Sequence, residues 1–140
     1  MIADVAKVSM SDGTFIQAIE LFPGRQGLMA FNVQRLPVNG RVLDRKIETK
    51  NDVVALILSN GETLCGSRDQ RVATMKDKRV YFKEMADVEI GTRLRGQIAG
   101  MPTSVMVVGT MFYPKKDIRL VELMLDHNKM FVVDGVLCRS

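Results

Sequence analysis

Four pairs of an aspartate or asparagine followed by a glycine divide the chain, and they constrain its fold more than any other feature. They are Asp12-Gly13, Asn39-Gly40, Asn60-Gly61 and Asp134-Gly135, each flanked by apolar or alternating residues. A type I′ hairpin turn needs positive φ at both central positions, which Asp, Asn and Gly tolerate, and its twist matches that of paired strands. Four such pairs in 140 residues predict an antiparallel protein rich in hairpins.

The segments between these pairs have the composition of β-strands. Helical signal is thin: only Phe82–Val88 predicts a turn or two of helix, and no window of about twelve residues keeps an apolar stripe at helical spacing. We therefore predict a single all-β domain over residues 1–140, with many short antiparallel strands and little helix. The expected strands are Val5–Met10, Thr14–Ile19, Asp52–Leu58, Glu62–Cys65, Val105–Val108, Arg119–Leu125, Met130–Val133 and Val136–Cys138.

Composition and charge place the chain among globular proteins with a modest basic excess. Hydrophobic residues make up 46% and charged residues 26% of the chain, which argues against disorder. The net charge of +4 is compatible with an acidic partner such as nucleic acid but does not require one. No apolar run approaches the roughly 18 residues of a membrane span, and the first residues lack the pattern of a signal peptide. We expect no membrane association and a cytoplasmic location, or a virion if a phage encodes the chain.

Two cysteines and one histidine limit the chemistry of the chain. Cys65 and Cys138 are too few for a disulfide framework, and with the lone His127 they cannot form a standard structural zinc site. The sequence contains no GxxxxGK[ST], GxGxxG or GxSxG motif, so phosphate-binding loops and nucleophile elbows have no support. We therefore expect no metal and no cofactor.

Four segments spread over nearly the whole chain follow one another in a recognisable order. They are Val8–Gly13 with Ile19–Gly24, then Leu56–Leu64 running into Ser67–Thr74, then Lys83–Leu94, and finally Phe131–Ser140. Together they resemble a minimal Hint domain, the fold shared by inteins, hedgehog autoprocessing modules and bacterial intein-like domains. The resemblance implies a horseshoe-shaped β domain whose N- and C-terminal strands lie side by side at its centre.

The resemblance also implies a chemistry. In that family a Cys or Ser at the first position of the domain attacks the preceding peptide carbonyl. The histidine of a Thr-x-x-His block donates to the leaving nitrogen, and neighbouring donors stabilise the oxyanion. A terminal Asn, assisted by a penultimate His, then cyclises. The matching positions in this chain are Met1, Ser67 with Gln70, and Arg139 with Ser140.

The side chains at these positions lack the groups that the chemistry needs. Met1 is a thioether without an acidic proton, and if it is the initiator there is no upstream peptide to cut. Ser67 keeps a hydroxyl, but the amide of Gln70 cannot move a proton near pH 7. Arg139 stays protonated, and Ser140 cannot form a succinimide. We therefore expect a Hint fold that has lost its splicing chemistry and is not an enzyme.

Three functions remain open after this comparison of positions. The first is a stand-alone structural or protein-binding module, used in repeated copies in a larger assembly. Domain-sized relatives of this kind fit best in a phage, as a decoration, cement or connector protein of the virion. The second is an autoprocessing domain with an unconventional site at Ser67 or Cys138. The third is a small basic protein that binds nucleic acid or inhibits another protein.

Other residues that could carry chemistry have an ordinary structural interpretation. Free cysteines are commonly buried, so we expect Cys65 and Cys138 to be small apolar residues of the core. His127 precedes the last hairpin, and we expect it in a turn exposed to water. The basic clusters Lys76–Arg79, Arg93–Arg95 and Lys115–Lys116 are expected to be solvated, which does not favour nucleic acid as a partner.

Two loops combine apolar or aromatic residues with positive charge and are the expected contact sites for a protein partner. Gly96–Thr103 contains Met101 and Pro102. Phe112–Asp117 contains Phe112, Tyr113, Lys115 and Lys116. Surface loops of this composition are typical of binding sites.

Overall fold

The computed structural model describes residues 1–98, 100–113 and 118–140. In these residues the elements are β-strands, most of them short but with β5 and β11 reaching 14 and 13 residues, and three 3₁₀ helices of three residues each. The strands are β1 (Ile2–Ala3), β2 (Lys7–Ser9), β3 (Phe15–Gln17), β4 (Gln26–Phe31), β5 (Pro37–Lys50), β6 (Val53–Leu58), β7 (Thr63–Ser67), β8 (Arg71–Lys76), β9 (Arg79–Glu84), β10 (Arg93–Ile98), β11 (Met101–Tyr113), β12 (Ile118–Leu125), β13 (Met130–Val133) and β14 (Val136–Arg139). The 3₁₀ helices are η1 (Ala18–Glu20), η2 (Met85–Asp87) and η3 (Asp126–Asn128).

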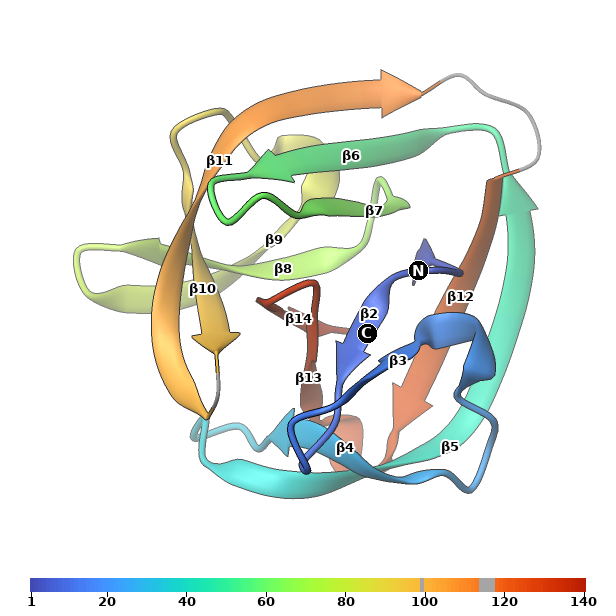
Figure 1. Cartoon of the computed structure of the whole chain (residues 1–140). Helices are drawn as coiled ribbons and strands as arrows, with labels where there is room; N and C mark the ends of the chain where they lie inside the picture. The colour runs from blue at the N-terminus through green and yellow to red at the C-terminus, as the bar shows by residue number, and fades with distance from the viewer. Residues whose placement is uncertain (99, 114–117) are drawn as a thin grey trace.

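The strands form one continuous antiparallel sheet, in which strands that lie far apart in the order also pair with each other. The order is β3-β2-β13-β4-β5-β12-β1-β7-β6-β11-β10-β14-β8-β9, and an additional pairing joins β13 to β14. In Figure 1 the first and last strands lie together in the middle, framed by β5, β6, β11 and β12. Val8 on β2 pairs with Val133 on β13, and Val133 also pairs with Val136 on β14. The predicted all-β fold, with its terminal strands side by side, is confirmed.

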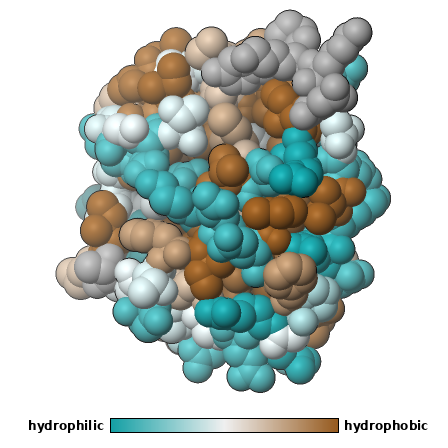
Figure 2. Space-filling model, turned by 45° about the vertical axis from the view of Figure 1, so that its right-hand side comes forward, coloured by the Kyte–Doolittle hydropathy of each residue, from teal (hydrophilic) through white to brown (hydrophobic). Residues whose placement is uncertain are grey.

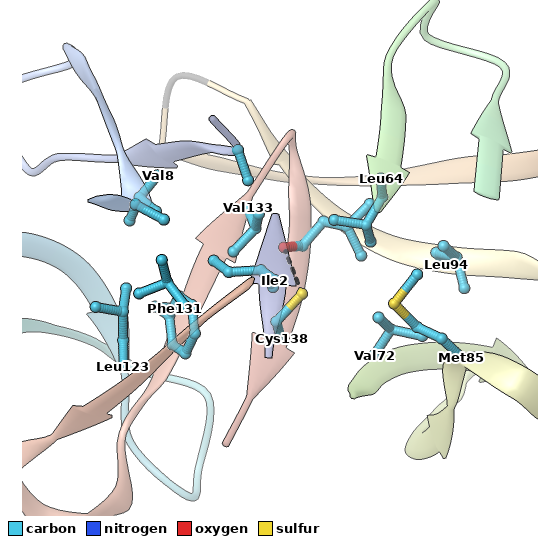
Figure 3. Close-up of a cluster of buried hydrophobic side chains, with 14 of the residues drawn as sticks. Ile2, Val8, Leu64, Val72, Met85, Leu94, Leu123, Phe131, Val133 and Cys138 are labelled. Carbon is cyan, nitrogen blue, oxygen red and sulfur yellow. Dashed lines mark hydrogen bonds between the residues drawn. The ribbon is translucent and has the colours of Figure 1, made fainter. Parts of the chain in front are cut away.

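The central hairpin is buried on both faces. Along β13, Phe131 and Val133 belong to one hydrophobic cluster, whereas Met130 and Val132 belong to a second. Successive side chains of a strand point to opposite faces, so an uninterrupted apolar run such as Met130–Val133 is what a strand between two clusters requires. Figure 3 shows the larger cluster, in which Phe131 lies beside Val8 and Leu123.

Three of the four predicted turns occur, in two geometries. Asp134 and Gly135 both have positive φ, 49° and 82°, as a type I′ turn requires. At Asp12-Gly13 and Asn60-Gly61 only the glycine has positive φ. There the N–H of Gly13 donates to the carbonyl of Met10, the pattern of a type I turn followed by a glycine bulge.

The prediction of a turn at Asn39-Gly40 is wrong. Both residues lie inside β5, where Asn39 pairs with Met29 and Gly40 with Leu28. The chain reverses instead at Asn32–Leu36, where the N–H of Asn32 donates to the carbonyl of Leu36. Gly40 serves close packing, because a Cβ there would lie 2.9 Å from the Cβ of Ala30. The predicted helix at Phe82–Val88 is reduced to η2, since Phe82 belongs to β9.

The turn after β13 carries a buried carboxyl group. Asp134 is 7% exposed, and its Oδ1 accepts a hydrogen bond of 3.2 Å from the backbone N–H of Lys7. Burial raises the pKa of Asp134 to about 6, although the hydrogen bond from Lys7 opposes the shift. The folded protein therefore favours the protonated form of this side chain more strongly than the unfolded chain does.

This burial predicts a pH-dependent contribution to stability. Between about pH 4 and pH 6 the folded protein holds a proton on Asp134 that the unfolded chain releases, so the contribution is complete below pH 4 and is lost as the pH rises through 6. A rise of about two pKa units corresponds to about 2–3 kcal/mol. Urea unfolding of the wild type and of Asp134→Asn, which tolerates positive φ, should show the wild type losing this amount relative to the variant from pH 4 to pH 7. A difference in unfolding free energy between the two proteins that does not change with pH would contradict the assignment. Asp77→Asn, at another turn residue with positive φ, is the matched control.

Candidate functional site

The main chain of the first residue is held by the turn between β7 and β8. The amino group of Met1 donates to Oε1 of Gln70 at 2.8 Å and to Oγ of Ser67 at 3.1 Å. The carbonyl of Met1 accepts from the backbone N–H of Ser67 at 2.9 Å. Two polar side chains of one turn thus contact the nitrogen of Met1.

Gln70 also joins this residue to the other end of the chain. Its side chain is 5% exposed, and its Nε2 donates to the carbonyls of Arg139 at 2.9 Å and Arg71 at 3.0 Å. Both ends of the amide are therefore satisfied, as burial of a polar group requires. A single glutamine side chain bridges the N-terminal residue and the last strand.

Strand pairing, a tight turn and a glycine explain why the ends meet here. The strand pair β8–β14 sets Arg71 opposite Arg139, directly beside Gln70. The N–H of Gln70 donates to the carbonyl of Ser67, which closes the turn. Gly66 leaves room for the first residue, because a Cβ there would lie 2.7 Å from the carbonyl oxygen of Met1.

A pocket of about 290 Å³ opens beside these contacts. Burial lowers the pKa of the Met1 amino group, and the charges of Asp69 and Glu122 act in the opposite direction. A hydrogen bond from Ser67 lowers the pKa of the Asp69 carboxyl. The lining residues are Met1, Asp69, Gln70, Arg71, Glu84, Glu122, Arg139 and Ser140.

The five positions implied by the family resemblance are all found at this place. Met1, Ser67, Gln70 and Arg139 are joined by hydrogen bonds. Ser140 lines the pocket, and its Oγ donates to the carbonyl of Leu123 at 2.6 Å. Asp69 and Glu122 also line the pocket and were not predicted from the sequence. No motif singles out Glu122, because its place in the pocket follows from the pairing of β12 with β5 and β1.

The other residues considered for chemistry do not line this pocket. Cys138 is buried, its Sγ donates weakly to the carbonyl of Val136 at 3.6 Å, and burial raises the pKa of its thiol. Burial also raises the pKa of the half-buried Cys65. His127 is exposed in η3 with φ 54°, so the prediction of a turn histidine is confirmed.

The residues predicted as contact sites are not brought together. Met101 and Phe112 are 66% and 51% exposed and lie eleven residues apart on β11 rather than in loops. Pro102 is exposed and pairs with Gln97, and the guanidinium of Arg68 lies 5.1 Å from the centre of the Phe112 ring. Lys115, Lys116 and the side chain of Tyr113 fall outside the described residues. Of the basic clusters, Lys76–Arg79 forms the end of the β8–β9 hairpin, and Arg93 and Arg95 lie on β10.

The pocket at Met1 is equipped for hydrogen bonding. Its described lining contains amide, guanidinium, hydroxyl and carboxylate groups but no thiol or imidazole. Over residues 1–98, 100–113 and 118–140, no three His, Cys, Asp or Glu side chains gather as they would to hold a metal ion. In the same residues, no helix is long and apolar enough to cross a membrane.

Similarity to other proteins is found in structure and not in sequence. No protein-family model matches the sequence, and no curated protein matches it. The solution structure of a bacterial intein-like domain from Clostridium thermocellum covers 100% of this chain and 99% of its own, with a TM-score of 0.83 and 16% identity. The DnaB intein from Synechocystis sp. PCC 6803 matches 99% of this chain and 96% of its own, with a TM-score of 0.82 and 14% identity. An intein from a hyperthermophile gives a TM-score of 0.82 at 12% identity. The whole chain therefore has the Hint fold of inteins and bacterial intein-like domains.

Proposed function

We propose that this chain is a Hint domain without splicing or cleavage chemistry that works by binding another protein. It acts as a repeated copy in a larger assembly, such as a phage virion in which it serves as a decoration, cement or connector protein. The cytoplasm or the virion is its location. The observation that carries the proposal is the contact between Met1 and Gln70.

The side chain that accepts the hydrogen bond from the nitrogen of Met1 cannot move a proton. Oε1 of Gln70 lies 2.8 Å from the nitrogen of Met1, where the family resemblance expects a histidine. An amide side chain donates and accepts hydrogen bonds but does not change its protonation near neutral pH. The thioether of Met1 cannot attack a carbonyl, and Ser140 cannot cyclise as asparagine does. Three separate steps of splicing therefore lack their reacting groups.

The alternative, autoprocessing at an unconventional residue, has weaker support. The thiol of Cys138 is 0% exposed and has a raised pKa, so little of the nucleophilic thiolate forms. The oxygen of Ser67 already accepts a hydrogen bond from the nitrogen of Met1, and its single proton has two acceptors within reach, the carbonyl of Met1 and the carboxyl of Asp69. No histidine lines the described part of the pocket to take its proton.

The surface supports binding because it leaves strand edges and apolar side chains accessible. Figure 2 shows apolar patches scattered among hydrophilic ones on one face of the molecule. β3 and β9 are the ends of the pairing order, and a free strand edge can pair with a neighbouring chain. Met101 and Phe112, near opposite ends of β11, are predicted contact residues with exposed apolar side chains.

The proposal is tested by purifying the protein from its native source and measuring its association state. We expect a stable complex with another protein, with an interface of at least about 1,000 Å². Met101→Lys or Phe112→Lys should weaken that complex at least about tenfold if the altered residue lies at its centre. Val33→Lys, at a residue that is 78% exposed in the β4–β5 loop, is the matched control and should leave it intact. A monomer without a protein partner that binds DNA or RNA tightly and in a salt-sensitive way would contradict the proposal.

A further inference from the structure

A second and larger pocket, of about 450 Å³, lies away from Met1 and shares no lining residue with the pocket there. The β2–β3 hairpin, the end of β10 and the Asp134-Gly135 turn surround it. Its size lies in the range of small-molecule sites, about 300–1,000 Å³. The apolar part of its lining is contributed by Met10, Phe15, Met29 and Ile98.

Two buried polar side chains line this pocket. The carboxyl of Asp134 is 7% exposed, and its one hydrogen bond within the described residues comes from the N–H of Lys7 to Oδ1. Gln97 is 8% exposed, and its backbone N–H donates to the carbonyl of Gly135. Its side-chain amide has no hydrogen-bond partner in residues 1–98, 100–113 and 118–140. Gln97 is not among the residues whose side-chain polar atoms are both sealed from solvent and unpartnered in the described residues, so its amide is accessible from the pocket and free to bond a ligand there.

The charges around the pocket indicate which sign of charge that ligand should carry. Lys7 and Glu62 form a salt bridge of 2.8 Å and cancel each other. Asp134 has no salt-bridge partner in the described part of the chain. When it is ionised, the three charged lining residues therefore sum to one negative charge, which a single cation would balance.

We propose that this pocket binds a small organic ammonium ion with an apolar or aromatic body. The ammonium group donates to the free carboxylate oxygen of Asp134 and to the side-chain oxygen of Gln97. The apolar body packs against Met10, Met29 and Ile98, and Phe15, which also lines the pocket, supplies an aromatic ring for the cation. The site is independent of the proposed loss of splicing chemistry.

The proposal is tested by titrating the isotope-labelled full chain with phenethylammonium and following backbone amide signals by NMR. Phenethyl alcohol and 3-phenylpropionate are the neutral and anionic probes of similar shape. We expect saturable shifts at Gln97 and Gly135, with the ammonium ion binding at least about tenfold more tightly than the alcohol, because charge-assisted hydrogen bonds are the stronger kind. Equal binding of the three probes, or no saturable shift at these amides, would overturn the proposal.

Two substitutions and one control assign the contacts. Asp134→Asn should remove the preference for the cation, and Gln97→Ala should weaken binding several-fold, whereas Asp77→Asn should change neither. Affinity in the wild type should rise between pH 5 and pH 7, as Asp134 ionises, and this dependence should disappear in Asp134→Asn. Lys7 and Glu62 are the charged groups that act on Asp134, and the charge of Asp134 in turn raises the pKa values of the Cys65 and Cys138 thiols. Retention of the cation preference in a folded Asp134→Asn variant would exclude Asp134 as the binding group.

Discussion

Replacing Phe131 with alanine is expected to lower the free energy of unfolding by about 3–5 kcal/mol, a large part of the roughly 5–15 kcal/mol that stabilises a typical domain. Phe131 is 2% exposed and lies on β13, where it pairs with Ala30 on β4 and Cys138 on β14. Its ring lies in the cluster that holds the first and last strands together (Figure 3). The truncation removes buried apolar surface and leaves a cavity that strands paired on both sides cannot close.

Urea unfolding followed by circular dichroism measures this loss. Phe15→Ala is the matched control, because Phe15 is 62% exposed, and its substitution should change stability by no more than about 0.5 kcal/mol. Equal effects of the two substitutions would mean that β13 is not at the centre of the core. A large effect at Phe131 alone supports the arrangement in which the N- and C-terminal strands share one cluster.

Local sequence pattern was sufficient to predict those elements in which the turn residues and the strand composition indicate the same structure. The β13–β14 hairpin was predicted because apolar runs flank Asp134-Gly135, and both residues adopt the positive φ that their side chains tolerate. The β8–β9 hairpin was not predicted, because its two positive-φ residues are Asp77 and Lys78 and no glycine marks the turn. The Asn39-Gly40 pair led to a wrong prediction because its glycine is present without a turn. There the glycine is required by close packing between strands, which depends on residues distant in sequence.

The candidate site was predicted from the family resemblance and not from local sequence pattern. Met1 is 69 positions from Gln70 in sequence, and Gln70 is 69 positions from Arg139. No periodicity or spacing relates residues so far apart. Their proximity was therefore inferred from the order of the four Hint-like segments. The larger pocket was not predicted at all. The sequence marks Asp134 only as a turn residue and does not mark Gln97 at all, and the burial of both beside a pocket depends on the folded chain.

The largest chemical effect is expected from restoring the missing groups together. Met1→Cys supplies a nucleophile, Gln70→His a proton donor, Arg139→His the penultimate imidazole and Ser140→Asn the side chain that cyclises. Each supplies a different step, so any one alone should leave the chain uncut. The four together, in a fusion with flanking tags, should release fragments at the junctions. A single substitution that restores cleavage would contradict the view that several steps are missing.

The proposed absence of splicing chemistry is tested most directly by the unchanged chain with one tag fused before Met1 and another after Ser140. Mass spectrometry after long incubation, with and without thiol or hydroxylamine, measures the fraction of full-length product, and circular dichroism establishes that the fusion is folded. We predict full-length product under every condition, because the groups nearest the first junction are an amide, a thioether and a hydroxyl already engaged in hydrogen bonds. Cleavage at either junction that is lost on substituting Ser67 or Cys138 would contradict the account and establish autoprocessing.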